Sequence, residues 1–293
     1  MYVFPLLGGY EFIFFRLFGP GLGNSLLVWA RALIYSRKYN LKMLEPTWNN
    51  FTLGPIIRNQ IDFRLYNGIF KKNTNYLKNL KLVIFKKKFL EENLLNYNFE
   101  SDAILIVKGL KNLFKELINF NDLVLKNLIE ITNERHLEGL NFNYKNSITL
   151  HVRRSDFVES FGESQITCDD WFIRIVDLLR KELSSNLRVY IFTDVKDEKI
   201  KKLMSIPNAY RLNYKSSIAD LLSMTKSKIF IGSKNSTFSH WVSYLGGMPT
   251  IWPKDCHINR IHQNLLRENV IESDGYFLND KFMNECEKNL SLK

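Results

Sequence analysis

The chain has 293 residues, of which 45% are hydrophobic and 14% aromatic, so it can bury large cores and is not a disordered protein. Lysine and arginine outnumber aspartate and glutamate by 41 to 30, which gives a formal net charge of +11. Much of this excess lies in residues 58–90, and such a face could meet nucleic acid, an anionic membrane or an acidic polymer. The simpler alternative is a composition that is rich in lysine and asparagine throughout.

The cysteines and the N-terminus indicate the cellular compartment in which the protein is found. Cys168, Cys256 and Cys286 are widely spaced and form no C-x-x-C pair, so neither a zinc ribbon nor a disulfide framework is indicated. The apolar N-terminus lacks the basic segment of a signal peptide, and Pro5 and Glu11 interrupt it within the length of one membrane span. The sequence therefore predicts a cytoplasmic protein that is soluble or peripherally attached to a membrane.

The chain begins with a predicted strand over residues 11–18, a glycine-rich turn over residues 19–23, and a helix capped by Asn24 and Ser25. The helix has one apolar stripe, formed by Leu26, Leu27, Ala30, Leu33 and Ile34. A strand, a glycine turn and a helix N-terminus can bring backbone N–H groups to an anion. The match to G-x-G-x-x-G is incomplete, and tight packing of a strand on a helix would need the same glycines.

The rest of the first half is less regular. Residues 40–105 are rich in asparagine, lysine and aromatics, and leucine spacing predicts helices over 103–117 and 122–137. A polar linker follows over residues 141–146. We place the domain boundary there, which gives domains over residues 1–145 and 146–293.

From residue 147 the pattern alternates regularly between strands and helices. The predicted strands cover residues 148–152, 189–193, 210–212, 228–232 and 249–252. The predicted helices cover residues 169–183, 196–204, 218–225 and 236–245. This alternation with short loops predicts an α/β fold with a parallel, doubly wound sheet.

Polar residues follow three of these strands. Arg153 and Arg154 come directly after the first, Asp194 follows the second, and a polar segment over residues 233–238 follows another. Ligands bind at the carboxyl ends of strands in such sheets, and a guanidinium matches phosphate oxygens. The alternative is a surface basic pair that is ion-paired to Asp156.

The segment over residues 233–238 contains four residues that can bind an anion at a helix N-terminus. They are Ser233, Asn235, Ser236 and Thr237. Together with free backbone N–H groups they could hold a phosphate without a metal. An ordinary helix cap by Asn235 or Ser236 is the competing explanation, but a cap requires only one such residue.

Four ordered segments resemble one enzyme family. His-Val-Arg-Arg-Ser-Asp at residues 151–156 resembles the H-x-R-R-x-D motif of the α-1,2-fucosyltransferases of glycosyltransferase family 11. Residues 235–245 resemble the N-S-T-F-S-W-W-G-A-Y-L segment of that family. Residues 18–24 resemble its G-G-L-G-N turn, and residues 191–194 its F-S-D strand end. The chain is identified on these motifs as a relative of the bacterial members.

This resemblance implies a GT-B-like pair of Rossmann-type domains with the nucleotide-sugar site in the cleft. The first domain, residues 1–145, would mainly bind the acceptor, and residues 146–293 would bind the GDP-sugar. The last helix could pack back on the first domain. The implied reaction is inverting transfer of L-fucose from GDP-fucose, without a metal or another cofactor, to galactose in α-1,2 linkage during surface glycan synthesis.

The resemblance also implies roles for individual residues. Arg153 would be the primary diphosphate ligand, and Arg154 would support it or hold the local structure. Asp194 and His151 would lie on the guanine or ribose side, although a buried structural histidine is an alternative for His151. The remaining expected donor contacts are Gly23 and Asn24 from the first domain and Asn235, Ser236, Thr237 and Phe238 from the second.

Inversion requires a base for the acceptor hydroxyl. Asp156 is a candidate because it follows the phosphate site directly, and Glu159 and Glu163 lie in the next loop. Asp156 could equally orient Arg154, and a dissociative transition state would reduce the need for a base. The residues expected to act in catalysis are Arg153, Asp156 and His151.

Departures from the family pattern leave the acceptor and the sugar open. Pro20 is inserted in the glycine turn, His240 replaces a tryptophan, and Val242 and Ser243 replace Gly-Ala. A transferase for another GDP-deoxyhexose, or a non-catalytic relative that binds GDP or a glycan, would fit the same motifs. A nucleic-acid-binding protein is disfavoured because the charge lies away from the motifs. The expected partners are GDP-fucose, a glycan acceptor that could be lipid-linked, and an anionic membrane contacted by residues 58–90.

Overall fold

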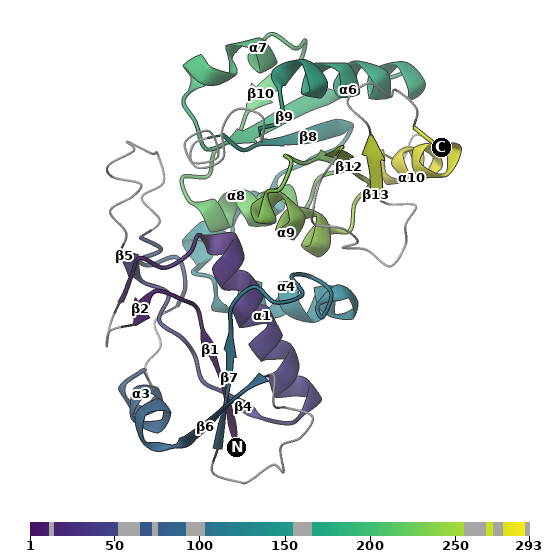
Figure 1. The fold of residues 1–293 in the computed structure, drawn as a ribbon. Coiled ribbons are helices and arrows are strands. Elements are labelled where there is room, and N and C mark those ends of the chain that lie inside the picture. The colour runs from purple at the N-terminus through teal and green to yellow at the C-terminus, as the bar shows by residue number, and fades with distance from the viewer. Residues whose placement is uncertain are drawn as a thin grey trace. The chain divides into compact units, whose positions relative to one another are not determined.

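The computed structural model describes residues 1–11, 15–51, 65–71, 76–91, 103–154, 166–254, 268–271 and 278–290. The chain forms two compact units, and it passes from the first to the second between Asn133 and Glu134. Each unit contains its own parallel sheet (Figure 1). The segment after Asn133 belongs to the second unit because its 3₁₀ turns pack on that unit: the turn Glu138–Asn141 contacts helix α8 (Ser217–Met224).

The first unit is built on four parallel strands in the order β4-β1-β7-β6. Their bounds are β1 Tyr2–Leu6, β4 Lys42–Met43, β6 Lys87–Leu90 and β7 Ala103–Lys108. Helix α1 (Leu22–Lys38) contacts β1, β4 and β7, and its predicted apolar stripe is fully buried. Helix α3 (Tyr76–Phe85) contributes Leu82 and Val83 to a second cluster with Phe4, Ile104 and Ile106.

The predicted first strand, over residues 11–18, is wrong. Around it the chain forms β2 (Tyr10–Glu11) and β3 (Arg16–Leu17), which join β5 (Asn50–Phe51) in a separate three-stranded sheet, and residues 12–14 lie outside the described part. The strand β1, one of the two inner strands of the four-stranded sheet, lies before this segment in the chain. Among the described strands, β4 pairs only with Tyr2 and Val3, so Pro5 adjoins β7 but no strand on the other edge.

The helix predicted over residues 103–117 is also wrong. Five apolar residues, from Ala103 to Val107, and Lys108 form the strand β7, which pairs with β1 on one side and β6 on the other. The next predicted helix is confirmed in position but is shorter: α4 covers Asn121–Ile131. It follows the 3₁₀ turn Ile118–Phe120 and precedes two more, Glu134–His136 and Glu138–Asn141.

The second unit is built on a six-stranded sheet with the order β10-β9-β8-β11-β12-β13, and all neighbours are parallel. Its strands are β8 Ser147–Val152, β9 Arg188–Thr193, β10 Ala209–Arg211, β11 Ile229–Ile231, β12 Thr250–Pro253 and β13 Glu268–Ile271. Its helices are α6 Asp169–Glu182, α7 Lys201–Met204 after the 3₁₀ turn Asp197–Ile200, α8, α9 Thr237–Gly246 and α10 Asp280–Leu290. The predicted α/β class with a doubly wound parallel sheet is confirmed.

The two faces of this sheet differ in chemistry. One face is aliphatic, with Ile148, Leu150 and Ile191 packed on α6, α7 and α10. The face toward α8 and α9 carries polar and aromatic residues, including Thr149 and His151. The buried residues of α10, namely Phe282, Cys286 and Leu290, lie in the aliphatic core of the second unit.

None of the described helices combines the length and the apolar character needed to cross a membrane.

Candidate donor site at the strand ends

The strand order of the second unit reverses between β8 and β11. From β8 the chain continues outward to β9 and β10, whereas β11 to β13 lie on the other side of β8. The connection after β8 therefore leads to α6 on the aliphatic face, and the connection after β11 leads to α9 on the polar face. Such a reversal opens a crevice at the carboxyl ends of the two strands, where ligands of open α/β sheets bind.

Arg153 lies at this point, directly after β8, and pairs with Asp194 at the end of β9. Its Nη1 atom lies 3.0 Å from Oδ2 of Asp194, and the two side chains are 23% and 15% exposed. The other carboxylate oxygen, Oδ1, accepts a hydrogen bond of 2.9 Å from the backbone N–H of Arg154. Asp194 thus holds both the side chain of Arg153 and the turn that presents it, while that side chain stays partly exposed.

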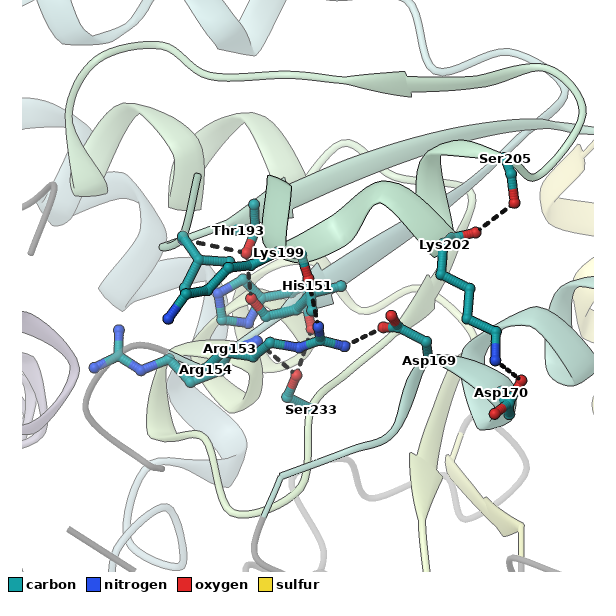
Figure 2. Close-up of polar contacts among 12 residues, drawn as sticks. His151, Arg153, Arg154, Asp169, Asp170, Thr193, Lys199, Lys202, Ser205 and Ser233 are labelled. Carbon is teal, nitrogen blue, oxygen red and sulfur yellow. Dashed lines mark hydrogen bonds and ion pairs between the residues drawn. The ribbon is translucent and has the colours of Figure 1, made fainter. Parts of the chain in front are cut away.

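Arg154 points elsewhere. Its guanidinium donates to the carbonyl oxygen of Lys199 at 2.7 Å and forms an ion pair with Asp169 at the start of α6 (Figure 2). Both contacts connect the end of β8 to the elements on the aliphatic face. Of the two roles expected for Arg154, the geometry favours the one in which it holds the local structure.

Ser233 connects the two strands on either side of the reversal. Its hydroxyl donates to the carbonyl oxygen of His151 at 2.6 Å and accepts from the backbone N–H of Arg153 at 2.9 Å (Figure 2). Because both groups belong to the end of β8, one buried hydroxyl fixes the backbone that carries Arg153. Ser233 is therefore a structural bridge rather than a free anion ligand.

The loop after β11 is fixed at several points. Asn235 has a left-handed backbone with φ 53°, and Ser236 caps α9 by accepting from the N–H of Ser239 at 3.2 Å. The backbone N–H of Lys234 donates to the hydroxyl of Thr167 at 2.9 Å. The helix-cap explanation thus holds for Ser236, and the partly exposed Thr237 and Phe238 begin the first turn of α9.

His151 is buried beneath this loop, with 4% of its surface exposed. Its Nδ1 atom lies 2.6 Å from the hydroxyl oxygen of Ser239, and its ring lies 5.0 Å from that of Phe238. Burial, reinforced by the charge of Arg153 and opposed by that of Asp194, lowers the pKa of His151 from 6.5 to about 3. The imidazole is therefore neutral at ordinary pH.

Comparison with known proteins agrees with a donor site at these strand ends. Glycosyl transferase family 11 matches residues 47–261. The chain belongs to this family.

Solved structures resemble this family 11 chain over most of its length. A NodZ alpha-1,6-fucosyltransferase soaked with GDP-fucose and the fucosyltransferase NodZ from Bradyrhizobium each show 12% identity, cover 88% of this chain and 97% of their own, and give a TM-score of 0.50. POFUT1 in complex with GDP shows 13% identity over 86% of this chain and 97% of its own, with a TM-score of 0.47. No curated protein sequence matches the chain. At these identities the likeness to NodZ shows the fold alone, and it confirms the predicted GT-B-like α/β class.

The departure at His240 of this family 11 chain lies in the core. His240 is fully buried, and its ring stacks on Trp252 with centroids 4.0 Å apart and planes 10° apart. Its Nδ1 atom donates to the carbonyl oxygen of Ser236 at 2.7 Å. A Cβ at Gly232 would overlap the same Trp252 ring. The histidine is therefore part of the packed core and not of the exposed part of the strand ends.

Two expected donor contacts belong to the first unit. Gly23 and Asn24 lie in the first turn of α1, not before it as predicted, because Gly21 is the N-cap. The preceding turn is fixed by Asn50, whose Oδ1 accepts from the N–H of Gly19 at 3.0 Å. Gly23 is buried and Asn24 is half-buried. Their contact with a donor stays a prediction.

Three acidic candidates lie outside the described residues: Asp156, Glu159 and Glu163. Two residues that the sequence did not single out are placed at the site by the structure. The hydroxyl of Thr167 accepts from the loop after β11, and the hydroxyl of Ser239, which lies within the motif over residues 235–245, bonds to His151. A polar residue facing a strand end across the polar side of the sheet is the signal that could have found Ser239.

Proposed function

We propose that this family 11 chain is an inverting, metal-independent fucosyltransferase that uses GDP-fucose as its donor. The observation that carries the proposal is the partly exposed side chain of Arg153, which Asp194 and Ser233 hold at the reversal of strand order, next to the loop that leads into α9. Family membership and the NodZ fold, whose structure was soaked with GDP-fucose, support the same donor. Other GDP-deoxyhexoses remain the runner-up.

The arrangement suits the departure of a diphosphate. As the glycosidic bond breaks, negative charge develops on the leaving phosphate, and a fixed cation together with helix-terminal N–H groups stabilises that charge. In this proposal Arg153 contacts the diphosphate and Asp194 keeps its guanidinium in place. Asn235, Thr237 and Phe238 supply further contacts, while Ser236 and Arg154 shape the loop and the strand end. Gly23 and Asn24 would approach from the first unit.

We propose a hydroxyl of a glycan, with α-1,2 linkage to galactose, as the group that attacks during surface glycan synthesis, and the first unit as the part that binds it. Asp156 is the proposed base. His240 does not argue for a different sugar, since it is buried against Trp252.

Arg153→Ala tests the proposal. Removing one preorganised charge from a developing anion should lower kcat for GDP-fucose by about 10²–10³-fold and weaken GDP binding, with the fold retained. Arg211→Ala is the matched control, because Arg211 is also ion-paired to an aspartate, Asp197, at another strand of the same sheet. Full activity in Arg153→Ala, or equal losses in both variants, would contradict the role of Arg153.

A donor screen by hydrolysis tests the sugar. GDP-fucose, GDP-mannose and a UDP-sugar should be compared with the wild-type chain, and GDP-fucose should be turned over fastest. If another GDP-sugar is turned over faster, the proposed diphosphate contact of Arg153 still holds, but fucose is not the transferred sugar.

We also propose that the first unit attaches peripherally to an anionic membrane, on the inner, cytoplasmic face of that membrane. Ile84 and Phe85, at the end of α3, are 56% and 82% exposed. Exposed Lys81, Lys87 and Lys88 lie beside them in the sequence. Apolar side chains that enter the headgroup region next to cations are typical of interfacial contact.

Vesicle co-sedimentation tests this attachment. Adding phosphatidylserine to phosphatidylcholine vesicles should strengthen binding on the order of a hundredfold for three lysines, at about 1 kcal/mol each. Phe85→Ser should weaken binding about tenfold, whereas Tyr210→Ser, at an exposed ring of the second unit, should not. Binding that does not depend on phosphatidylserine would refute the attachment, and binding to RNA but not to vesicles would assign the lysines to nucleic acid.

A further inference from the structure

The hydroxyl of Ser239 has two partners at the donor site. It lies 2.6 Å from Nδ1 of His151, and it accepts a hydrogen bond of 3.2 Å from the backbone N–H of Ser233. Ser239 is fully buried in the first turn of α9, so water does not reach its hydroxyl. Within the described residues, these two are the only hydrogen bonds of the hydroxyl group.

Counting protons determines the direction of the first bond. The N–H of Ser233 can only donate, so the Ser239 oxygen accepts there and its own proton has one remaining partner, Nδ1 of His151. If Nδ1 carried the proton instead, the serine hydroxyl would be buried with a proton and no acceptor, which is the costly arrangement for a polar group. Nδ1 therefore accepts, and the ring proton of the neutral imidazole is on Nε2.

We propose that Ser239 is a positioning residue that fixes the tautomer of His151, so that His151 presents Nε2–H and acts as a hydrogen-bond donor to the bound nucleotide sugar. Among the described residues, no protein group forms a hydrogen bond with Nε2 of His151. Nε2 is also not one of the fully buried polar atoms that lack a partner, so it keeps some exposed surface. The atom is thus available at the carboxyl end of β8, next to Arg153. Only the identity of the acceptor as a nucleotide sugar rests on the proposed function.

The tautomer changes what His151 can do. Nε2 with a proton has no lone pair in the ring plane, so it cannot take the proton of an acceptor hydroxyl. It can donate to an oxygen of a phosphate, a ribose or a base carbonyl. The expectation that His151 takes part in catalysis then narrows to binding and orientation of the donor, and the base must be another group.

Nitrogen-15 NMR of histidine in the ligand-free protein tests the tautomer without depending on the function. We expect His151, assigned by its loss in His151→Gln, to show a protonated Nε2 and an unprotonated Nδ1. Ser239→Ala should give a mixture of tautomers, while Ser239→Thr, which keeps the hydroxyl, should restore the wild-type spectrum. Ser243→Ala is the control on the same helix, because its buried hydroxyl pairs with Thr250 instead. A protonated Nδ1 in the wild type, or no change in Ser239→Ala, would overturn the proposal.

Substitution of His151 separates a donor from a base. Glutamine places an N–H near the position of Nε2 but cannot act as a base, so His151→Gln should bind GDP within about threefold of wild type and keep transfer. His151→Ala should weaken GDP binding by about tenfold. Unchanged GDP affinity with a loss of transfer of 10²-fold or more in His151→Gln would show a base at this position and refute the donor role. If the wild type itself does not bind GDP, the proposed function fails, while the NMR result still decides the tautomer.

Discussion

Ser233→Ala should affect the stability of the second unit and the geometry of its donor site together. The substitution removes the hydroxyl that bridges the carbonyl of His151 and the N–H of Arg153, at 2.6 and 2.9 Å. Ser233 is buried, so water cannot replace both bonds at its position. Two lost hydrogen bonds with partners left unsatisfied correspond to about 2–3 kcal/mol of unfolding free energy. For a unit of this size the melting temperature should fall by roughly 4–12 °C.

Ser227→Ala is the matched control for this experiment. Ser227 is also buried against β8, but its hydroxyl makes one bond, of 2.8 Å, to Thr149, away from the strand end. Its loss should cost about 1 kcal/mol and leave GDP affinity unchanged. Ser233→Ala should weaken GDP binding by about tenfold, because the backbone of Arg153 is no longer fixed; this corresponds to 1.4 kcal/mol.

Thermal unfolding and a GDP titration of the three proteins provide the comparison. If Ser233→Ala is no less stable than Ser227→Ala and binds GDP like the wild type, the hydroxyl of Ser233 does not fix Arg153, and the bridging role is refuted.

Two further predictions concern pH and the second arginine. Burial lowers the pKa of His151 to about 3, whereas the unfolded chain takes up this proton near pH 6.5, so the stabilising contribution of neutral His151 is complete above pH 6.5 and decreases as the pH falls. By about pH 5 the loss should reach about 2 kcal/mol, and urea unfolding of His151→Gln should show a weaker dependence over the same range; parallel pH profiles would contradict the buried, neutral state. Arg154→Ala removes the donor to Lys199 and the partner of Asp169, so it should destabilise the unit by about 2 kcal/mol but change GDP affinity less than threefold. A larger effect on GDP than that of Arg153→Ala would exchange the roles of the two arginines.

The sequence predicted the second unit well because local and global signals agree there. Strands such as β8 and β9 are short apolar runs that end in polar residues, and helix α6 has an amphipathic stripe with acidic residues in its first turn. Each element therefore has one periodicity and a clear end. The bounds of the strand β13 and of the helix α10 were not predicted from the sequence.

The first half shows where such signals fail. Ala103 to Val107 are all apolar, and a strand buried on both faces has no alternation that would distinguish it from a buried helix. The N-terminal strand β1 was not predicted, and it contains Pro5 at a position where β4 no longer pairs. Both errors arise because the deciding partner strands are far away in the sequence.

The donor site was predicted in outline but not in its connections. Motifs located Arg153, Asp194 and the loop after β11, and the structure brings these strand ends together. Sequence could not show that Ser236 caps a helix or that Arg154 pairs with Asp169, because both depend on how hydroxyls and charges are shared in three dimensions. The same limit applies to Ser239.

The bond between Arg153 and Ser233 joins residues that are 80 positions apart in the chain. The polypeptide between them contains α6, β9, β10 and α8, yet β11 pairs directly with β8. Closing the chain over this distance is entropically costly, so the pairing depends on the contacts that the assembled sheet provides. An anion that binds at this junction requires that β8 and β11 are paired, so it stabilises the pairing against forms of the unit in which the two strands are apart. Occupation by a nucleotide would then raise the free energy needed to open the sheet at this point.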